Sequence, residues 1–278
     1  MDALVTTQWL ADELGAADLR IVDATYVDGA SGRDPAAEYR AGHIPGAVFL
    51  NLAQLRDTSA DLPNTLPDAK TIADRLGILG IASGDRIVLY DDAPWHTSAR
   101  AWFLLRMFGA RNVAILDGGI ARWRAEGRET VAGDTAPRAA AFDVQPDLRK
   151  VRGLAQMQAN LDTSPEQIVD ARSAARFTGE EADPRAGVAP GHIPGSSNLP
   201  YGKMFDADGL WTRGDALKAA FADAGIDLTK PIVTTCGSGI TAAVVAFGAH
   251  LLGTEAALYD GSWSEWGANP ATPKETGK

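Results

Sequence analysis

An internal duplication constrains this chain more than any other feature of its sequence. Four landmarks occur twice in the same order, with the two copies roughly 145 residues apart. The pairs are IVDA at 21–24 and 168–171, GHIPG at 42–46 and 191–195, RIVLY at 86–90 with PIVTT at 231–235, and LDGGIARW at 116–123 with YDGSWSEW at 259–266. This period is far longer than that of a solenoid repeat, so each copy should be a whole domain.

Each half alternates short apolar strands with helical segments. Runs rich in β-branched residues predict strands at 19–24, 86–90 and 113–116 in the first half, and at 167–171, 231–235 and 256–259 in the second. Apolar spacing predicts helices at 99–108 and from about 241 to 252, each followed by a glycine. The alternation favours an α/β fold of two similar domains, each a mostly parallel sheet flanked by helices. We predict domains at 1–130 and 151–278, joined by a polar, Ala-rich linker at 131–150.

The charge and the N-terminal sequence exclude several classes of protein. The chain has 26 Lys and Arg against 36 Asp and Glu, a formal charge of −10 at pH 7. Such a surface repels phosphate backbones, so we expect no nucleic-acid partner. No basic segment precedes an apolar core near the N-terminus, and the longest nearly apolar stretch, 240–252, is too short to cross a bilayer. We therefore expect a cytoplasmic protein with no membrane partner.

The single cysteine, Cys236, lies where α/β proteins place their sites. One thiol forms no intramolecular disulfide and no cysteine cluster for zinc, and we expect neither a metal nor a cofactor. Cys236 directly follows the strand PIVTT and precedes GSGIT, after which a helix begins, so it should lie at the carboxyl edge of the sheet. Gly237 and Gly239 let the backbone curl so that several N–H groups face one anion, such as a thiolate. The alternative is an inert core cysteine, but two glycines and a serine are poor core material.

At this loop the sequence resembles the rhodanese superfamily, in its tandem-domain sulfurtransferase form, across nearly the whole chain. The duplicated GHIPG, the LDGG and YDGS strand ends and the six-residue loop CGSGIT carry the resemblance. The loop has no Lys or Arg, and in this respect it is similar to the branch of the family that acts on 3-mercaptopyruvate. The branch that acts on thiosulfate carries basic residues there. Asp91 occupies the nucleophile's position in the first copy, so that domain should be non-catalytic.

The resemblance implies sulfur transfer from 3-mercaptopyruvate through a persulfide on Cys236, with release of pyruvate. The acceptor would be cyanide, a small thiol or thioredoxin. The loop residues Gly237, Gly239, Ile240 and Thr241 would bind the substrate through their backbone N–H groups. Arg176 in RFTG and Arg185 in DPR would bind its carboxylate, since a guanidinium suits bidentate contacts. The alternative is that these arginines pair on the surface with Glu180, Glu181 and Asp183.

The family further implies a relay of Ser238 with a histidine and an aspartate from the first domain. These map to His43 in GHIPG and Asp34 in SGRDP. His192 lies in an identical pentapeptide, which also favours a structural role in which each imidazole bonds a local carbonyl. Ser238 itself could be a small polar filler in a crowded loop. We expect a relay through His43 and a structural His192.

Three rival functions follow from the same residues. Thiosulfate:cyanide sulfur transfer is the nearest, and the uncharged loop disfavours it. A cysteine phosphatase needs an arginine six residues after its cysteine, and position 242 is Ala. A non-catalytic sulfur carrier or regulatory module is opposed only by the intact Cys236 loop.

Overall fold

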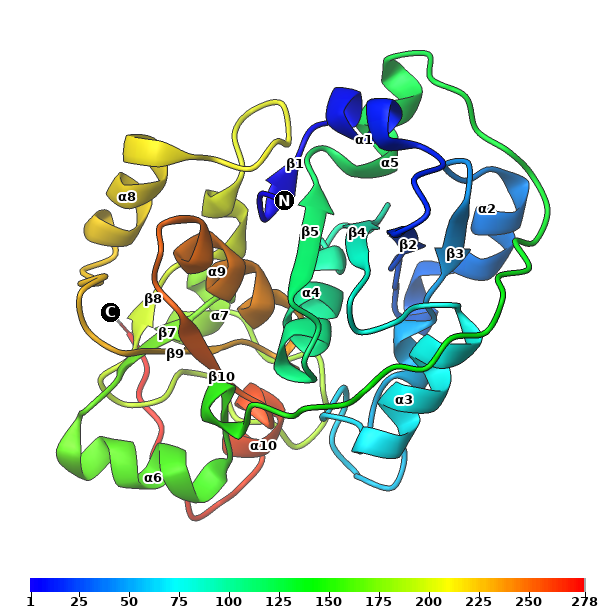
Figure 1. The fold of residues 1–278 in the computed structure, drawn as a ribbon. Helices are drawn as coiled ribbons and strands as arrows, with labels where there is room; N and C mark the ends of the chain where they lie inside the picture. Colours follow the sequence, from blue (N-terminus) through cyan, green and yellow to red (C-terminus); the bar gives the residue numbers. More distant parts are fainter. Residues whose placement is uncertain (278) are drawn as a thin grey trace. The chain divides into compact units, whose positions relative to one another are not determined.

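The computed structural model describes residues 1–277 and divides them into two compact units (Figure 1). Unit 1 comprises Met1–Thr58 and Leu66–Asp147. Unit 2 comprises Ser59–Thr65 and the chain from Leu148 onward. A short segment of the first half therefore packs with the second unit.

Unit 1 is built on a five-stranded parallel sheet in the order β1-β5-β4-β2-β3. Its strands are β1 (Leu4–Val5), β2 (Leu19–Asp23), β3 (Ala47–Phe49), β4 (Arg86–Tyr90) and β5 (Asn112–Leu116). Its helices are α1 (Thr7–Glu13), α2 (Pro35–Ala41), α3 (Ala69–Ile78), α4 (Ser98–Met107) and α5 (Gly119–Ala125), with 3₁₀ turns at Gly29–Ser31 and Leu52–Gln54. The central strands β2 and β4 are buried along almost their whole length, as expected for a sheet covered on both faces.

Unit 2 repeats this arrangement strand for strand, in the order β6-β10-β9-β7-β8. Its strands are β6 (Val151–Arg152), β7 (Gln167–Asp170), β8 (Ser197–Asn198), β9 (Ile232–Thr235) and β10 (Ala256–Tyr259). Its helices are α6 (Leu154–Thr163), α7 (Ala174–Thr178), α8 (Gly214–Asp223), α9 (Ile240–Leu251) and α10 (Ser262–Trp266), with 3₁₀ turns at Leu148–Lys150 and Tyr201–Met204. The predicted pair of α/β domains with parallel sheets is thus confirmed.

Most of the stretch that we expected as a linker lies in unit 1. Val131 forms an antiparallel bridge with His43. Farther along, Ala140 N donates to Gly77 O at 3.0 Å, and Gln145 N donates to Phe108 O at 2.9 Å. These bonds join backbone groups, so they leave no periodic pattern of side chains in the sequence. The chain consequently leaves unit 1 after Asp147, later than residue 130.

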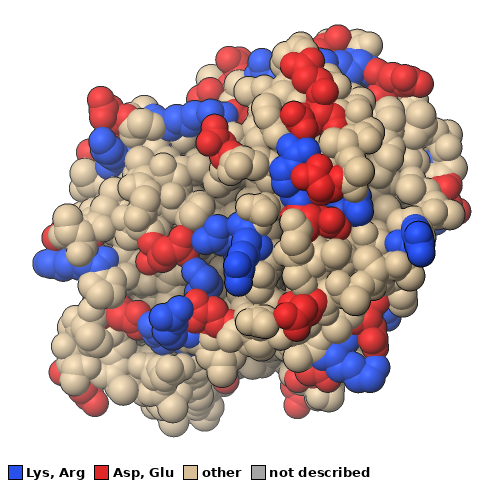
Figure 2. All heavy atoms as spheres, in the orientation of Figure 1, with Lys and Arg blue, Asp and Glu red and all other residues tan. Residues whose placement is uncertain are grey.

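Charged side chains are interspersed on the face that Figure 2 shows, and neither sign gathers there in one large patch. Exposed ion pairs occur in the described residues, for example Arg122 with Glu126 and Lys70 with Asp74. Such pairs add little to stability. No helix within residues 1–277 is long and apolar enough to cross a bilayer.

Candidate active site

Cys236 lies at the carboxyl end of β9, in the turn that leads into α9. Its side chain is buried, with 1% of its surface exposed. Gly239 adopts φ +83° as the residue before α9, a conformation that glycine accepts without steric cost. This turn brings Gly239 N within 3.1 Å of Cys236 Sγ. The sulfur thus accepts an N–H at the start of a buried twelve-residue helix, whose dipole favours negative charge there.

The first turn of α10 forms hydrogen bonds with the Cys236 loop. Trp263 N donates to Cys236 O at 2.9 Å, and Ser264 donates to Gly237 O through both its N, at 3.0 Å, and its Oγ, at 2.5 Å. Ser262 Oγ accepts from Cys236 N at 3.4 Å. The loop carbonyls are therefore tied to neighbouring backbone, which fixes the position of the thiol.

Ser262 and Ser264 are not among the site residues predicted from the sequence. A signal was available in the duplication, because the first copy has Gly119 and Ala121 at the corresponding positions. The two serines occur only in the copy that carries the cysteine. Ser262 also keeps the left-handed backbone of its counterpart, with φ +49° against +56° for Gly119.

Arg176 and Arg185 both lie against the loop, as the notion of a substrate clamp requires. A Cβ on Gly237 would meet Arg185 Nη2 at 3.1 Å and Arg176 Nη2 at 3.3 Å. The two arginines arrive from different elements, since Arg176 lies on α7 and Arg185 on the following loop.

Asp183 holds the two arginines together. Its side chain is 1% exposed and accepts from Arg176 Nη2 at 2.5 Å and from Arg185 Nη1 at 3.1 Å. One carboxylate between two guanidiniums leaves an excess positive charge beside the loop. Arg176 Nε is buried and has no hydrogen-bond partner among the described residues. A buried donor without a partner is costly unless a ligand fills the role, so this group suits an anionic substrate.

Ser238 is half-buried and bonds a residue of the first half of the sequence. Asn64 Nδ2 donates to Ser238 Oγ at 3.2 Å, and Asn64 belongs to the segment that packs with unit 2. Ile240 and Thr241 begin α9 directly after the loop. These loop residues, with the arginines, form a continuous site at the carboxyl edge of the unit 2 sheet.

His43 and Asp34 have local partners within unit 1. Asp34 is the N-cap of α2 and accepts from Ala36 N and Ala37 N. His43 is 2% exposed, stacks on the Tyr39 ring with centroids 4.1 Å apart, and has Nδ1 2.9 Å from Tyr39 O. These contacts give both residues a structural role within unit 1.

His192 has the same surroundings in unit 2. Its ring stacks on Phe177 with centroids 3.8 Å apart, and its Nδ1 lies 2.8 Å from Phe177 O. The duplicated GHIPG turn thus uses both imidazoles to bond the carbonyl of an aromatic residue.

In unit 1, the carboxylate of Asp91 stands in the place of the Cys236 thiol and accepts hydrogen bonds from N–H groups that follow it in the chain. Asp91 Oδ1 accepts from Ala93 N at 3.0 Å, and Oδ2 accepts from Ser98 N at 2.8 Å. These two backbone N–H groups already donate to Asp91, so they are not available to bind an anionic ligand.

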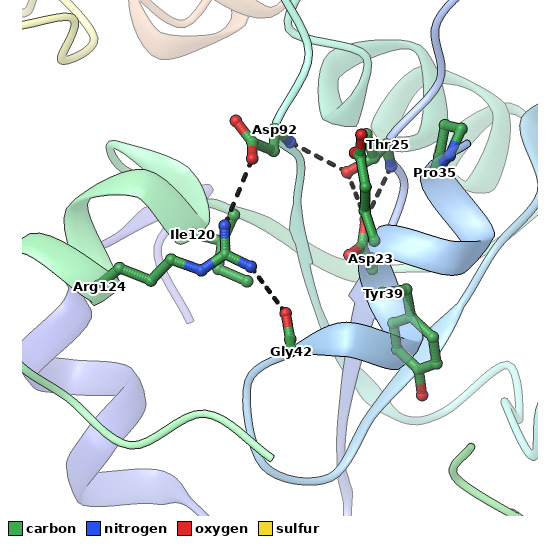
Figure 3. Close-up of a pocket in the computed structure, with 9 residues that line it drawn as sticks. Asp23, Thr25, Pro35, Tyr39, Gly42, Asp92, Ile120 and Arg124 are labelled. Atoms are coloured by element: carbon green, nitrogen blue, oxygen red, sulfur yellow. Dashed lines mark hydrogen bonds and ion pairs between the residues drawn. The ribbon is translucent and has the colours of Figure 1, made fainter. Parts of the chain in front are cut away.

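A pocket beside this loop is lined by residues that bond one another (Figure 3). Arg124 bonds Asp92 Oδ2 at 3.4 Å and Gly42 O at 2.8 Å, and Thr25 bonds Asp23. No group of ligating side chains within residues 1–277 could hold a metal ion.

Comparisons with known proteins match this architecture. The model of the Rhodanese-like domain matches twice, at residues 6–126 and 154–269. The chain is 38% identical to the 3-mercaptopyruvate sulfurtransferase of Mus musculus over 95% of this chain and 91% of the relative, and 35% identical to the thiosulfate sulfurtransferase of Cricetulus griseus over 99% and 96%. It is similar to the crystal structure of SseA from Escherichia coli, described as that of a 3-mercaptopyruvate sulfotransferase, with 34% identity, a TM-score of 0.86 and coverage of 95% of this chain and 99% of that chain.

Proposed function

Because the chain belongs to the rhodanese family, with two Rhodanese-like domains, we propose that it is a 3-mercaptopyruvate sulfurtransferase whose nucleophile is Cys236. The observation that carries the proposal is the buried thiol at a helix N-terminus with Arg176 and Arg185 beside its loop. This combination provides a nucleophile and a carboxylate clamp in one site. The relatives that act on 3-mercaptopyruvate support the choice of donor.

In the first half of the reaction, the Cys236 thiolate attacks the sulfur of 3-mercaptopyruvate. A sulfur–sulfur bond forms, the carbon–sulfur bond breaks, and pyruvate departs as an enolate that keeps the electron pair and takes a proton at carbon. Loop N–H groups of Gly237, Gly239, Ile240 and Thr241 stabilise the negative sulfur, and Gly239 N already faces Sγ. Arg176 and Arg185 hold the substrate carboxylate.

In the second half, an acceptor takes the outer sulfur of the persulfide. A thiolate or cyanide attacks that sulfur, and the sulfur–sulfur bond breaks with its electron pair returning to Cys236. Reduced thioredoxin would act in the same way through its own thiolate. These acceptors and the cytoplasmic location stay predictions.

The resemblance also suggests that Asp34 and His43 relay protons to Ser238. Both residues form hydrogen bonds with the backbone of unit 1, so the proposed mechanism assigns no step to them. The relay stays a prediction, with a test of its own in the Discussion.

Thiosulfate is a second candidate donor. The excess positive charge of Arg176, Arg185 and Asp183 lies against Gly237, and this charge favours a compact dianion beside the thiol. The thiosulfate sulfurtransferase among the relatives agrees with this possibility. We expect thiosulfate to be the poorer donor because the loop itself carries no cation.

The decisive experiment compares the two donors on one preparation. Pyruvate release from 3-mercaptopyruvate and thiocyanate formation from thiosulfate plus cyanide are measured side by side. Intact mass after donor alone should show one added sulfur, and the Cys236→Ser variant should show none. Higher kcat/KM with thiosulfate would overturn the choice of donor, and turnover by Cys236→Ser would overturn the nucleophile.

A further inference from the structure

The hydroxyl of Ser238 is held by Asn64, which lies 174 positions earlier in the chain. Asn64 Nδ2 donates to Ser238 Oγ across a distance of 3.2 Å. The contact depends on Ser59–Thr65, the segment of the first half that packs with unit 2. A bond between such remote positions, at the loop that carries Cys236, calls for a functional explanation.

Asn64 has an unusual backbone conformation at the point where its side-chain amide meets Ser238. Asn64 has φ +56°, in the left-handed region that side-chain-bearing residues rarely adopt. Asparagine is among the few residues other than glycine that enter this region readily. Ser238 lies between Gly237 and Gly239, which have no side chains that could orient the hydroxyl instead.

We propose that Asn64 is the positioning residue for Ser238 in the sulfur-transfer reaction; this inference rests on the proposed function. The amide N–H occupies a lone pair of Ser238 Oγ, so the hydroxyl proton points to another acceptor. In the proposed reaction that acceptor is the negative charge that develops beside Cys236 as the pyruvate enolate departs. Ser238 donates a hydrogen bond and transfers no proton, so the chemical balance of the step is unchanged.

Asn64 holds the hydroxyl without any titratable group. An amide neither gains nor loses a proton near neutral pH. Arg176 and Arg185 lie against Gly237 in this loop, and Asp183 forms ion pairs with both. An acid in place of the amide would therefore add a pH dependence that the native contact lacks.

Two substitutions separate the amide from the backbone conformation. Asn64→Gly keeps the left-handed backbone and removes the donor, so kcat for 3-mercaptopyruvate should fall about three- to tenfold. KM should stay within about twofold, since the arginines that bind the carboxylate are untouched. Asn64→Asp keeps the size but makes the side chain an acceptor, which draws the Ser238 proton toward itself. Its activity relative to the native protein should recover as the pH falls and the new carboxyl is protonated.

A double-mutant cycle decides whether Asn64 acts through Ser238. In a Ser238→Ala background, Asn64→Gly should cause almost no further loss of kcat. Ser164→Gly is the matched control, because Ser164 has φ +46° in an exposed turn at the end of α6, and it should leave kcat unchanged. Equal losses from Asn64→Gly with and without Ser238, or unchanged kcat in Asn64→Gly and Asn64→Asp, would overturn the inference. A native protein that forms no persulfide from 3-mercaptopyruvate would instead overturn the proposed function.

Discussion

At the scale of single residues, one duplicated aspartate has different surroundings in the two units. Asp23 ends β2 and bonds Thr25 N at 2.9 Å and Thr25 Oγ1 at 2.5 Å. Burial is the main reason that its pKa is raised from 3.8 to about 6. Asp170 ends β7 at the corresponding position, but its charge is paired with buried Arg172, with Nη2 and Oδ2 2.6 Å apart.

This difference predicts opposite effects of the same substitution. The raised pKa of Asp23 means that its contribution to stability is present below about pH 4 and is lost as the pH rises through about 6. Asp23→Asn should therefore increase the free energy of unfolding by up to about 3 kcal/mol at pH 8 and change it little at pH 4. Asp170→Asn should lower it by about 3–5 kcal/mol at pH 8, because Arg172 loses its partner. Urea unfolding at both pH values measures this, and a pH-independent effect of Asp23→Asn would contradict it.

The predicted relay through His43 can be tested by comparison with His192, which has the same surroundings in unit 2. If His43 moves protons, His43→Asn should change the shape of the pH profile of kcat/KM, whereas His192→Asn should leave that shape as it is in the native protein. Both substitutions should also lower the melting temperature, since each imidazole is buried against an aromatic ring. Identical pH profiles in the two variants would assign His43 to structure alone.

Arg176 should control the binding of the donor. Arg176→Ala should raise KM for 3-mercaptopyruvate roughly ten- to a hundredfold, because a charge-assisted bond is worth about 1.5–3 kcal/mol. The KM for cyanide, which has no carboxylate, should stay the same. Arg213→Ala removes an exposed arginine of the same unit and serves as the control. If the donor kinetics of Arg176→Ala were unchanged, the role of Arg176 would be limited to its ion pair with Asp183.

At the scale of elements, the Cys236 loop is shaped around the two guanidiniums. A methyl group on Gly237 would approach Arg185 Nη2 and Arg176 Nη2 to 3.1 and 3.3 Å, so the arginines must shift by a few tenths of an ångström. We expect Gly237→Ala to raise KM for 3-mercaptopyruvate about three- to tenfold while the persulfide still forms at saturating donor. Gly202→Ala has open space at its Cβ and should be neutral. Full loss of persulfide in Gly237→Ala would show that the loop itself had collapsed.

The elements that sequence patterns predicted well are the long buried ones. β4 and β10 have the predicted bounds, and the predicted helix at 99–108 is α4 at Ser98–Met107. The two-residue strands β1, β6 and β8 are too short to show any periodicity, so no pattern could reveal them.

Within the site, sequence motifs predicted the loop and both arginines but not their connections. The bond from Asn64 to Ser238 joins positions far apart in sequence, and no local pattern marks Asn64. The alternative interpretation of the arginines placed Asp183 on the surface, yet its side chain is 1% exposed, because burial of a carboxylate depends on tertiary packing around the two arginines.

At the scale of the whole molecule, unit 2 should fold without unit 1 and without its own segment Ser59–Thr65. Its core gathers residues of β7, β9, β10 and α10 with Met157 of α6. A fragment that starts at Leu148 should therefore give a cooperative unfolding transition. It lacks Asn64, so its kcat should fall at least as far as in Asn64→Gly. Circular dichroism and pyruvate release check the two statements, and a folded fragment with full kcat would contradict the second.

The assignment of Ser59–Thr65 to unit 2 has a consequence for synthesis on the ribosome. Unit 1 can complete its sheet once Asp147 has emerged, but the segment must wait for the Ser238 loop, roughly ninety residues later. At about 5–20 residues per second this interval lasts on the order of 5–20 s. During that time the nascent chain carries a folded first unit with an undocked loop, which a protease or chaperone can reach before the second unit exists.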